Sequence, residues 1–426
     1  MMRRDLPVAE SRRTRDSAAA VLRAILDHGP IARSSVARAS RLSAASVTGI
    51  VSSLLEAGLV REVPEAAGPP GNGRPHVPLD IELETVAVIG AHIAVPRTTV
   101  ALLDLRGRVL AQRQDPHGAR DPRSVLTALA ARVDDLRREH AAGRAILGLG
   151  LATGGWVDAA NGTVVDHNIL GWQHVPVAAV LSRATGLPVY ADSNSRALMR
   201  AEQLFGGATR QVRGSAVHLF VGNVVDVAFA TDGAVHQGPR SAAGAVAHLP
   251  VEGCAELCAC GRTGCLQAAV SERTLVRRAR AAGLIDRLEL RALIDVAQGR
   301  GPAGSEGRAG SGGPAGGEGR AGGEGRAGSA RAAALALFEE RARLVGRAAA
   351  LLLDLFDPEV LVVAEAGVNR LDPCLAVLRA EIADRSAAGA DVARVVRRSS
   401  FPADVLAVAG GAVALDRVYA EPLAAR

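Results

Sequence analysis

The chain has 426 residues, enough for two or three domains, and its 48% hydrophobic content excludes a generally disordered polymer. The formal charge of +6 favours an anionic partner. No apolar run approaches the roughly 18 residues of a membrane span, and the polar first residues lack the apolar core of a secretory signal, so we expect a cytoplasmic protein with no membrane partner.

Residues 1–82 predict a separate N-terminal head. Residues 1–16 are polar and Arg-rich and are expected to form a flexible arm. Apolar residues at helical spacing then predict a helix from Ser17 to the Gly29-Pro30 pair, a short second helix, and a third helix capped by Ser43. Two strands around a Gly/Pro-rich turn follow. Three helices and a hairpin within residues 17–82 are typical of a winged helix-turn-helix domain.

The third helix is the predicted reading helix. Its apolar residues repeat at helical spacing and are expected to face the core of the head. Its other face carries small side chains, which suit a helix that lies deep in a major groove and touches phosphates and thymine methyl groups. The residues expected at the DNA are Ser43, Ser46, Thr48, Gly49 and Ser52.

Three arginines of the head are further candidate DNA contacts. Arg33 and Arg38, on or beside the second helix, can pair with phosphates. Arg74 lies beside two glycines in the hairpin turn and is placed to enter a minor groove. For each arginine the alternative is a solvated surface charge with no DNA contact.

Residues 83–426 predict an α/β fold. Short strands alternate with glycine turns and helices from Val86 onward, and a similar layout recurs from Ala216, which indicates two related lobes. Residues 299–330 repeat the pentapeptide EGRAG and contain almost nothing to bury, so we expect a disordered Gly/Ala/Arg-rich insertion there. A nucleic-acid-binding role is the alternative for this insertion.

Four residues near the middle of the chain predict a structural zinc site: His248, Cys258, Cys260 and Cys265. One imidazole and three thiolates complete a tetrahedral sphere and leave no open position for water, so the ion is expected to stabilise and not to catalyse. Cys254 is an alternative to His248 as the fourth ligand, and unrelated buried thiols are the alternative to any metal. Cys374 is expected to pack in a core.

These residues resemble the signature of the ROK family, named for repressors, open reading frames and sugar kinases. The stretch CACGRTGCL follows the family pattern, with Ala247 in place of Gly and Gln267 in place of Glu. LATGGWVDAANGTVVDHNILGW and AVAGGAVALDRVY are similar to the family's sugar-side loop and closing helix. The resemblance implies a two-lobed, actin-like ATPase fold behind a winged helix-turn-helix. Arg41 stands where the family's turn between helices has Gly, so strain is expected if φ stays positive.

The resemblance also implies that kinase chemistry has been lost. The family's catalytic Asp aligns with Asn194, whereas a shifted alignment brings Asp192 into place but misaligns Glu202. Ala91 or His92 replaces the Asp of the first phosphate turn, and VGNVVDVAF replaces the glycines of the second. Ala245 replaces a sugar-binding Glu. We therefore expect no enzyme activity; the alternative is a sugar kinase that transfers phosphate from ATP to a hexose.

The leading prediction is a DNA-binding transcriptional repressor that recognises a double-stranded operator as a homodimer or homotetramer. The sugar side keeps Asn168, Asn194 and His248, so the effector is predicted to be a sugar or sugar-like molecule, or to have been lost. Asn168 is expected to hydrogen-bond a hydroxyl group of the ligand; the alternative is a capping or turn residue with no ligand contact. A DNA-binding scaffold without an effector is the remaining alternative.

Overall fold

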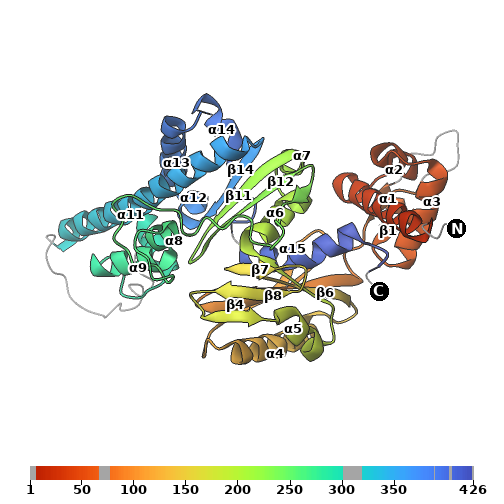
Figure 1. Ribbon diagram of the computed structural model, residues 1–426, viewed down its shortest axis with the longest axis horizontal. Coiled ribbons are helices and arrows are strands. Elements are labelled where there is room, and N and C mark those ends of the chain that lie inside the picture. Colours follow the sequence, from red (N-terminus) through yellow and green to blue (C-terminus); the bar gives the residue numbers. More distant parts are fainter. Residues whose placement is uncertain (1–5, 67–76, 301–318, 388, 403–404, 425–426) are drawn as a thin grey trace. The chain divides into compact units, whose positions relative to one another are not determined.

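The computed structural model describes residues 6–66, 77–300, 319–387, 389–402 and 405–424 (Figure 1). It divides into two compact units, one formed by Met1–Phe205 with Asp404–Arg426 and the other by Gly206–Ala403. In the part of the chain that is described, no helix has both the length and the apolar character to cross a bilayer.

The first unit begins with a three-helix head and a two-stranded sheet. Val21, Val36 and Val47, one from each helix, are buried, and an isolated bridge joins Ile31 to Leu79. This arrangement confirms the predicted winged helix-turn-helix. The elements are α1 (Leu6–His28), α2 (Arg33–Ser40), α3 (Ala44–Glu56), β1 (Val60–Glu62), a 3₁₀ turn (Pro64–Ala66) and β2 (Leu79–Ile81).

The predicted arm is wrong in its extent, because α1 begins at Leu6 and not near Ser17. Pro7 lies in the first turn of this helix, where its missing N–H leaves no intrahelical hydrogen bond unmade. The arginines and alanines that follow are good helix formers, so the polar composition is compatible with a helix. Residues 1–5 of the predicted arm lie outside the described part of the chain.

A five-stranded mixed sheet, in the order β10-β6-β3-β4-β5, forms the core of the first lobe behind the head. Its central strand β3 is buried along its whole length, because α4 and α5 lie on one face of the sheet and α15 on the other (Figure 1). The strands are β3 (Val86–Ile93), β4 (Arg97–Leu103), β5 (Val109–Pro116), β6 (Ala145–Thr153) and β10 (Val189–Ser193). The helices are α4 (Pro122–His140), α5 (Val177–Thr185), α6 (Asn194–Phe205) and α15 (Val405–Ala420), and a small antiparallel sheet contains β7 (Trp156–Asp158), β8 (Thr163–His167) and β9 (Trp172–Val175).

Helix α15 approaches this sheet backbone to backbone. A Cβ atom on Gly90 would lie 2.3 Å from the Gly411 nitrogen, and one on Gly150 would lie 2.2 Å from the Gly410 oxygen. No side chain fits at such a contact, so the glycines determine how closely the last helix lies on the sheet.

The second unit repeats the topology of the first lobe. Its sheet has the order β13-β12-β11-β14-β15, and in both sheets three antiparallel strands are followed by two parallel ones. The repeat confirms the predicted pair of related lobes in an actin-like α/β fold. The strands are β11 (Ser215–Val221), β12 (Val225–Thr231), β13 (Ala234–Val235), β14 (Val360–Glu365) and β15 (Val396–Arg398). The helices are α7 (Thr209–Gly214), α8 (Leu266–Val270), α9 (Glu272–Ala281), α10 (Leu290–Ala297), α11 (Gly319–Phe356), α12 (Ala366–Arg370), α13 (Asp372–Arg385), the 3₁₀ turn Gly389–Asp391 and α14 (Val392–Val395).

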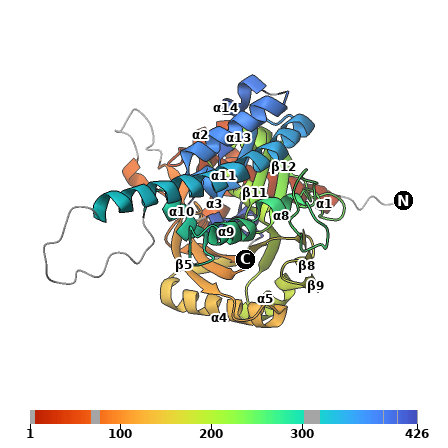
Figure 2. The same ribbon diagram turned by 90° about the vertical axis from the view of Figure 1, so that its left-hand side faces the viewer.

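The long helix α11 packs along α13 and begins inside the segment whose composition predicts disorder (Figure 2). The prediction of disorder is therefore wrong for residues 319–330. A helix that is already packed elongates by one hydrogen bond per residue without a new nucleus, which offsets the weak propensity of the glycines. Residues 301–318 of the predicted insertion lie outside the described part of the chain.

Candidate DNA-binding, effector and metal sites

Helix α3 presents a polar face of small side chains. Its first turn is capped by Ser43, whose Oγ accepts the Ser46 N–H at 3.1 Å. Val47, Val51 and Leu54 are buried and Ile50 is half-buried. The predicted contact residues are all exposed: Ser43, Ser46, Thr48, Gly49 and Ser52. The prediction of which face points outward is therefore confirmed.

The hydroxyl groups on this face already donate hydrogen bonds within the helix. Thr48 Oγ1 donates to the Ala44 oxygen at 2.8 Å, and Ser52 Oγ donates to the Thr48 oxygen at 3.1 Å. Each hydroxyl oxygen keeps lone pairs, so in these rotamers the face offers hydrogen-bond acceptors. The amino groups of cytosine and adenine are the major-groove donors that such acceptors match.

The arginines of the head have partners that the sequence did not indicate. Arg33 pairs with Glu62 of β1 at 2.7 Å, and Arg38 donates to Ser35 Oγ at 3.0 Å. A half-exposed ion pair contributes little to stability, so a DNA phosphate can replace the Glu62 carboxylate. Arg74 lies outside the described residues.

Arg41 ends α2 in the left-handed conformation, with φ 57° and ψ 33°. The Leu42 N–H next to it donates to the Ala37 oxygen at 3.1 Å, which closes the end of the helix. An L side chain in this conformation costs about 1–2 kcal/mol relative to glycine. The strain expected for a non-glycine residue at this turn is therefore present.

Arg41→Gly should raise the free energy of unfolding by about 0.5–1 kcal/mol, because relief of the left-handed strain exceeds the added entropy of the unfolded chain. Urea denaturation measures this change. Arg41→Ala is the control, since it removes the same charge but keeps the Cβ atom and should give no gain. Equal stability of the two variants would contradict a strained turn.

A neutral hydrogen-bonded pair forms around Asn194, the residue that the preferred alignment matches to the family's catalytic Asp. Asn194 begins α6 and is buried, and its Oδ1 accepts a hydrogen bond from His92 Nε2 at 3.0 Å. Burial lowers the pKa of His92 to about 4, so this imidazole is neutral at pH 7. An amide is not a base, and an imidazole of such low pKa is a weak one. The pair is therefore unsuited to taking a proton from a sugar hydroxyl.

Asp192, the candidate base of the shifted alignment, is held in buried ion pairs. Arg196 Nε lies 2.5 Å from one carboxylate oxygen and Arg200 Nη1 lies 2.5 Å from the other. Arg200 also pairs with Asp416 of α15 at 2.9 Å. Both carboxylate oxygens of Asp192 are therefore engaged in ion pairs that hold the first lobe together. Sequence reasoning missed this cluster, because Asp192 lies in β10 whereas Arg196 and Arg200 lie one helical turn apart on α6, so no single periodic pattern joins them.

The second phosphate turn, between β11 and β12, is occupied by the protein's own groups. The Val225 N–H donates to Gln267 Oε1 at 3.3 Å, and Asn223 Oδ1 accepts the Arg273 N–H at 3.0 Å. Gln267 is one of the residues that depart from the family signature. A backbone N–H with such a partner is not free for a nucleotide phosphate, which agrees with the predicted loss of this turn.

The predicted effector residues lie in different settings. Asn168 is exposed in a tight turn, in which the N–H groups of Leu170 and Gly171 donate to the His167 oxygen. Asn194 faces His92 within the first unit, whereas His248 belongs to the second. The turn at Asn168 matches the structural alternative for that residue.

The histidine and cysteines predicted to bind metal come together in the second unit. The ligand atoms of His248, Cys258, Cys260 and Cys265 all lie within 4.8 Å of one another. Cys258 Sγ is 3.8 Å from His248 Nδ1, and Cys260 Sγ is 3.8 Å from Cys265 Sγ. Cys254, the alternative fourth ligand, is not part of this group. The four residues can therefore hold one metal ion.

The geometry of this cluster fits a tetrahedral ion. Zinc–sulfur bonds of about 2.3 Å imply sulfur–sulfur separations of about 3.8 Å, as Cys260 and Cys265 show. Gly261 and Gly264 adopt φ of 85° and 74°, which lets the chain turn sharply between these ligands. Hydrogen bonds from Arg262, chiefly its backbone N–H, lower the pKa of Cys260 to about 7, toward the thiolate that a metal requires.

The family model for the ROK family matches residues 88–416 of the chain. The chain belongs to the ROK family. Transcriptional regulator Rv0485 of Mycobacterium tuberculosis is 34% identical over 96% of this chain and 87% of its own length. The DNA-binding transcriptional repressor Mlc of Escherichia coli is 29% identical over 62% of this chain and 64% of its own length.

A solved structure of a ROK family transcriptional regulator, described as a homolog of the E. coli Mlc protein, shares the fold. It is 22% identical, covers 97% of this chain and 98% of its own, and has a TM-score of 0.74. The similarity to Rv0485 extends through the DNA-binding head as well as both lobes. The chain is therefore a ROK transcriptional regulator and not one of the family's sugar kinases.

Proposed function

We propose that this ROK regulator is a repressor that reads a double-stranded DNA operator with α3. The observation that carries the proposal is the exposed face of Ser46, Thr48, Gly49 and Ser52 on a helix held by the Ser43 cap and a buried apolar side. Small side chains let the helix approach base edges closely. Arg33 and Arg38 supply phosphate contacts in this proposal, and Arg74 enters a minor groove. Ser43 lies at the helix N-terminus, where a phosphate can also bind.

The active form in this proposal is a homodimer or a homotetramer in the cytoplasm. One reading helix makes few base contacts, so specificity comes from two heads that bind half-sites separated by whole turns of DNA. A symmetric pair of chains supplies these two heads.

The proposed effector is a sugar-like molecule with fewer hydroxyl groups than a hexose, or none. Asn194 Oδ1 is engaged by His92, and Ala245 offers no acceptor where a sugar-binding Glu is expected. A hexose would leave hydroxyl groups without partners at both positions, which costs binding energy. Asn168, Asn194 and His248 remain the proposed contacts for a smaller ligand.

The proposed metal is a zinc ion held by His248, Cys258, Cys260 and Cys265. These four ligands complete the coordination sphere, so the ion supplies stability to the segment between β13 and α8 and no catalytic water.

Genome-wide footprinting of the purified full-length protein tests the proposed function. We expect protected duplexes that share two related half-sites, with affinity that falls steeply as salt rises. Binding without any sequence preference would contradict the operator proposal. If specific sites are protected, the genes beside them indicate the chemistry of the effector.

Glucose or N-acetylglucosamine, added at about 10 mM, should leave the melting temperature of the protein unchanged. Neither sugar is expected to bind, and a ligand raises the melting temperature only when it binds the folded state. Differential scanning fluorimetry measures this, and a coupled assay with ATP should detect no sugar-dependent ADP release. An upshift of several degrees with either sugar would contradict the proposed change of effector.

A further inference from the structure

The turn between β4 and β5 is held rigid from within. The buried carboxylate of Asp104 accepts the N–H groups of Arg106 and Arg108, both at 2.9 Å, and Gly107 adopts a φ of 73°. Gly107 also donates its N–H to the backbone carbonyl oxygen of Asp104 at 3.0 Å. The side chain of Arg106 therefore projects from a loop whose backbone is fixed.

Two buried helices of the first lobe support this turn. Tyr419 of α15 is fully buried, and its hydroxyl donates to the Leu105 oxygen at 2.7 Å. Phe205, the last residue of α6, lies so close to Gly107 that a Cβ there would be 2.7 Å from its ring. Phe205 and Tyr419 pack edge to face with ring centroids 6.3 Å apart. The position of the turn is thus determined by the lobe and not by the head.

Arg106 reaches from this turn to the DNA-binding head at two points. Its Nη1 donates to the Leu26 oxygen in the last turn of α1 at 3.1 Å, and its Nη2 donates to Asp80 Oδ1 of β2 at 2.5 Å. The side chains of Arg106 and Asp80 are only 23% and 13% exposed, so water competes weakly for this contact. Asp80 Oδ1 also accepts the Ile81 N–H at 2.8 Å, which holds the carboxylate in place.

We propose that Arg106 is a positioning residue for DNA binding. It sets the angle of the DNA-binding head on the first lobe by donating hydrogen bonds to both Leu26 and Asp80. The chain connects head and lobe only through the short link Glu82–Thr85, about which a head can rotate. Two hydrogen bonds from one planar guanidinium, one beside that link at Asp80 and one away from it at Leu26 of α1, oppose the rotation. The inference rests on the proposed operator binding, because the angle matters when two heads must enter the same duplex in register.

Contacts between α1 and α15 keep the head on the lobe when Arg106 is removed, so a variant should change the angle and not release the head. Full-length Arg106→Ala and Asp80→Ala are each expected to bind the footprinted duplex about tenfold more weakly, measured by fluorescence anisotropy. The double variant should be no weaker than either single one. Asp80→Ala is the decisive variant, since loss of a negative charge near DNA would by itself strengthen binding.

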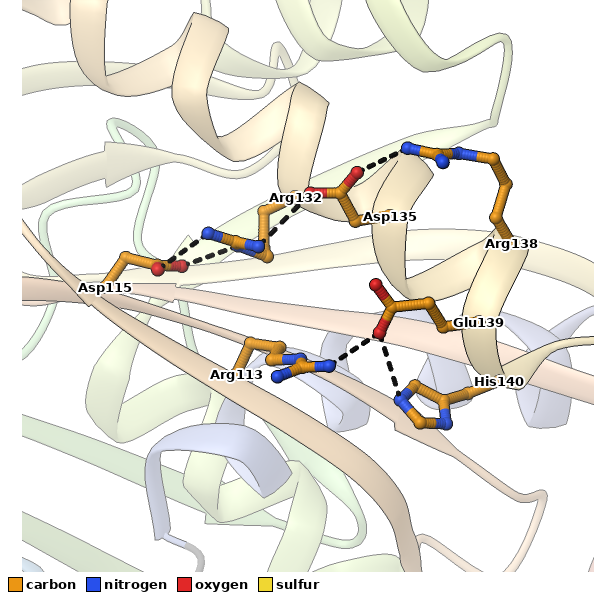
Figure 3. A network of polar contacts seen from close by, with 7 residues as sticks. All are labelled: Arg113, Asp115, Arg132, Asp135, Arg138, Glu139 and His140. Atoms are coloured by element: carbon orange, nitrogen blue, oxygen red, sulfur yellow. Dashed lines mark hydrogen bonds and ion pairs between the residues drawn. The ribbon is translucent and has the colours of Figure 1, made fainter.

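Arg132→Ala is the matched control. Arg132 Nε and Nη2 donate hydrogen bonds to the two carboxylate oxygens of Asp115, both at 2.8 Å. These bonds join α4 to β5 within the lobe, beside the pair of Arg113 and Glu139 (Figure 3). This variant loses the same charge as Arg106→Ala but should bind DNA as the wild type does. Arg106→Lys keeps the charge, yet one ammonium group replaces the planar fork, so we expect a loss of about threefold.

Wild-type affinity in Arg106→Ala or in Asp80→Ala would overturn the positioning role. So would equal losses in Arg106→Ala and Arg132→Ala, because they would report charge and not geometry. Thermal unfolding of each variant identifies any that fails to fold, in which case Arg106→Lys decides. A wild-type protein that selects no duplex overturns the operator proposal itself, which separates the two failures.

Discussion

Gly49→Glu should reduce operator binding by more than about a hundredfold while leaving the protein folded. A Cβ atom at Gly49 would meet nothing within 4 Å, so the fold has room for a side chain there. In the reading helix that same side chain would point at DNA, where a carboxylate is repelled by phosphates and holds the helix away from base edges. Glycine inside a helix costs about 0.5–1 kcal/mol relative to alanine, so the variant should be no less stable than the wild type.

Fluorescence anisotropy with the footprinted duplex and urea denaturation measure the two effects separately. Gly49→Ala is the control for stability, since it should show a similar gain and lose less than about tenfold in affinity. If Gly49→Glu kept its affinity within tenfold, α3 would not lie against the DNA.

Cys260→Ser should abolish the proposed zinc binding and lower the melting temperature by more than about 10 °C. A hydroxyl does not replace a thiolate ligand, and the free energy of binding a structural zinc ion is part of the free energy of folding. The loss of several kcal/mol corresponds to a shift of this size for a unit as large as Gly206–Ala403. Elemental analysis and differential scanning fluorimetry on the same preparation measure both changes.

Cys254→Ser is the matched control, because Cys254 lies in the same segment but outside the group of four. It should keep the metal and the wild-type melting temperature, and a strong chelator should reproduce the Cys260→Ser result in the wild type. Wild-type metal content in Cys260→Ser would contradict the zinc proposal. Loss of metal in Cys254→Ser would instead identify Cys254 as a ligand.

The parts of the fold that sequence reasoning predicted correctly depend on short-range patterns. The α3 cap and its buried face follow from residues a few positions apart, and so does the turn between Cys258 and Cys265. The errors lie at the ends of helices. Pro7 and the glycines near Gly319 usually discourage helix, but a packed helix extends through such residues at little cost.

The replacement of the kinase groups was only half predictable. The preferred alignment predicted that Asn194 stands where the family has its catalytic Asp, because that loss is a change of one residue type at one position. It did not show that His92, 102 residues earlier, would donate to the new amide. Nor did it show that Gln267 would occupy the Val225 N–H of the second phosphate turn.

The amino-acid sequence by itself determined that this protein has a helix-turn-helix, two lobes of one topology and a histidine–cysteine cluster, because each depends on periodicity or on close spacing along the chain. Only the tertiary structure decided which groups bond Asn194 and the Val225 N–H and how the head is held. Arg106 meets Leu26 and Asp80 because α6 and α15 place its turn beside the head. Contacts between such distant residues follow from packing, which no local pattern encodes.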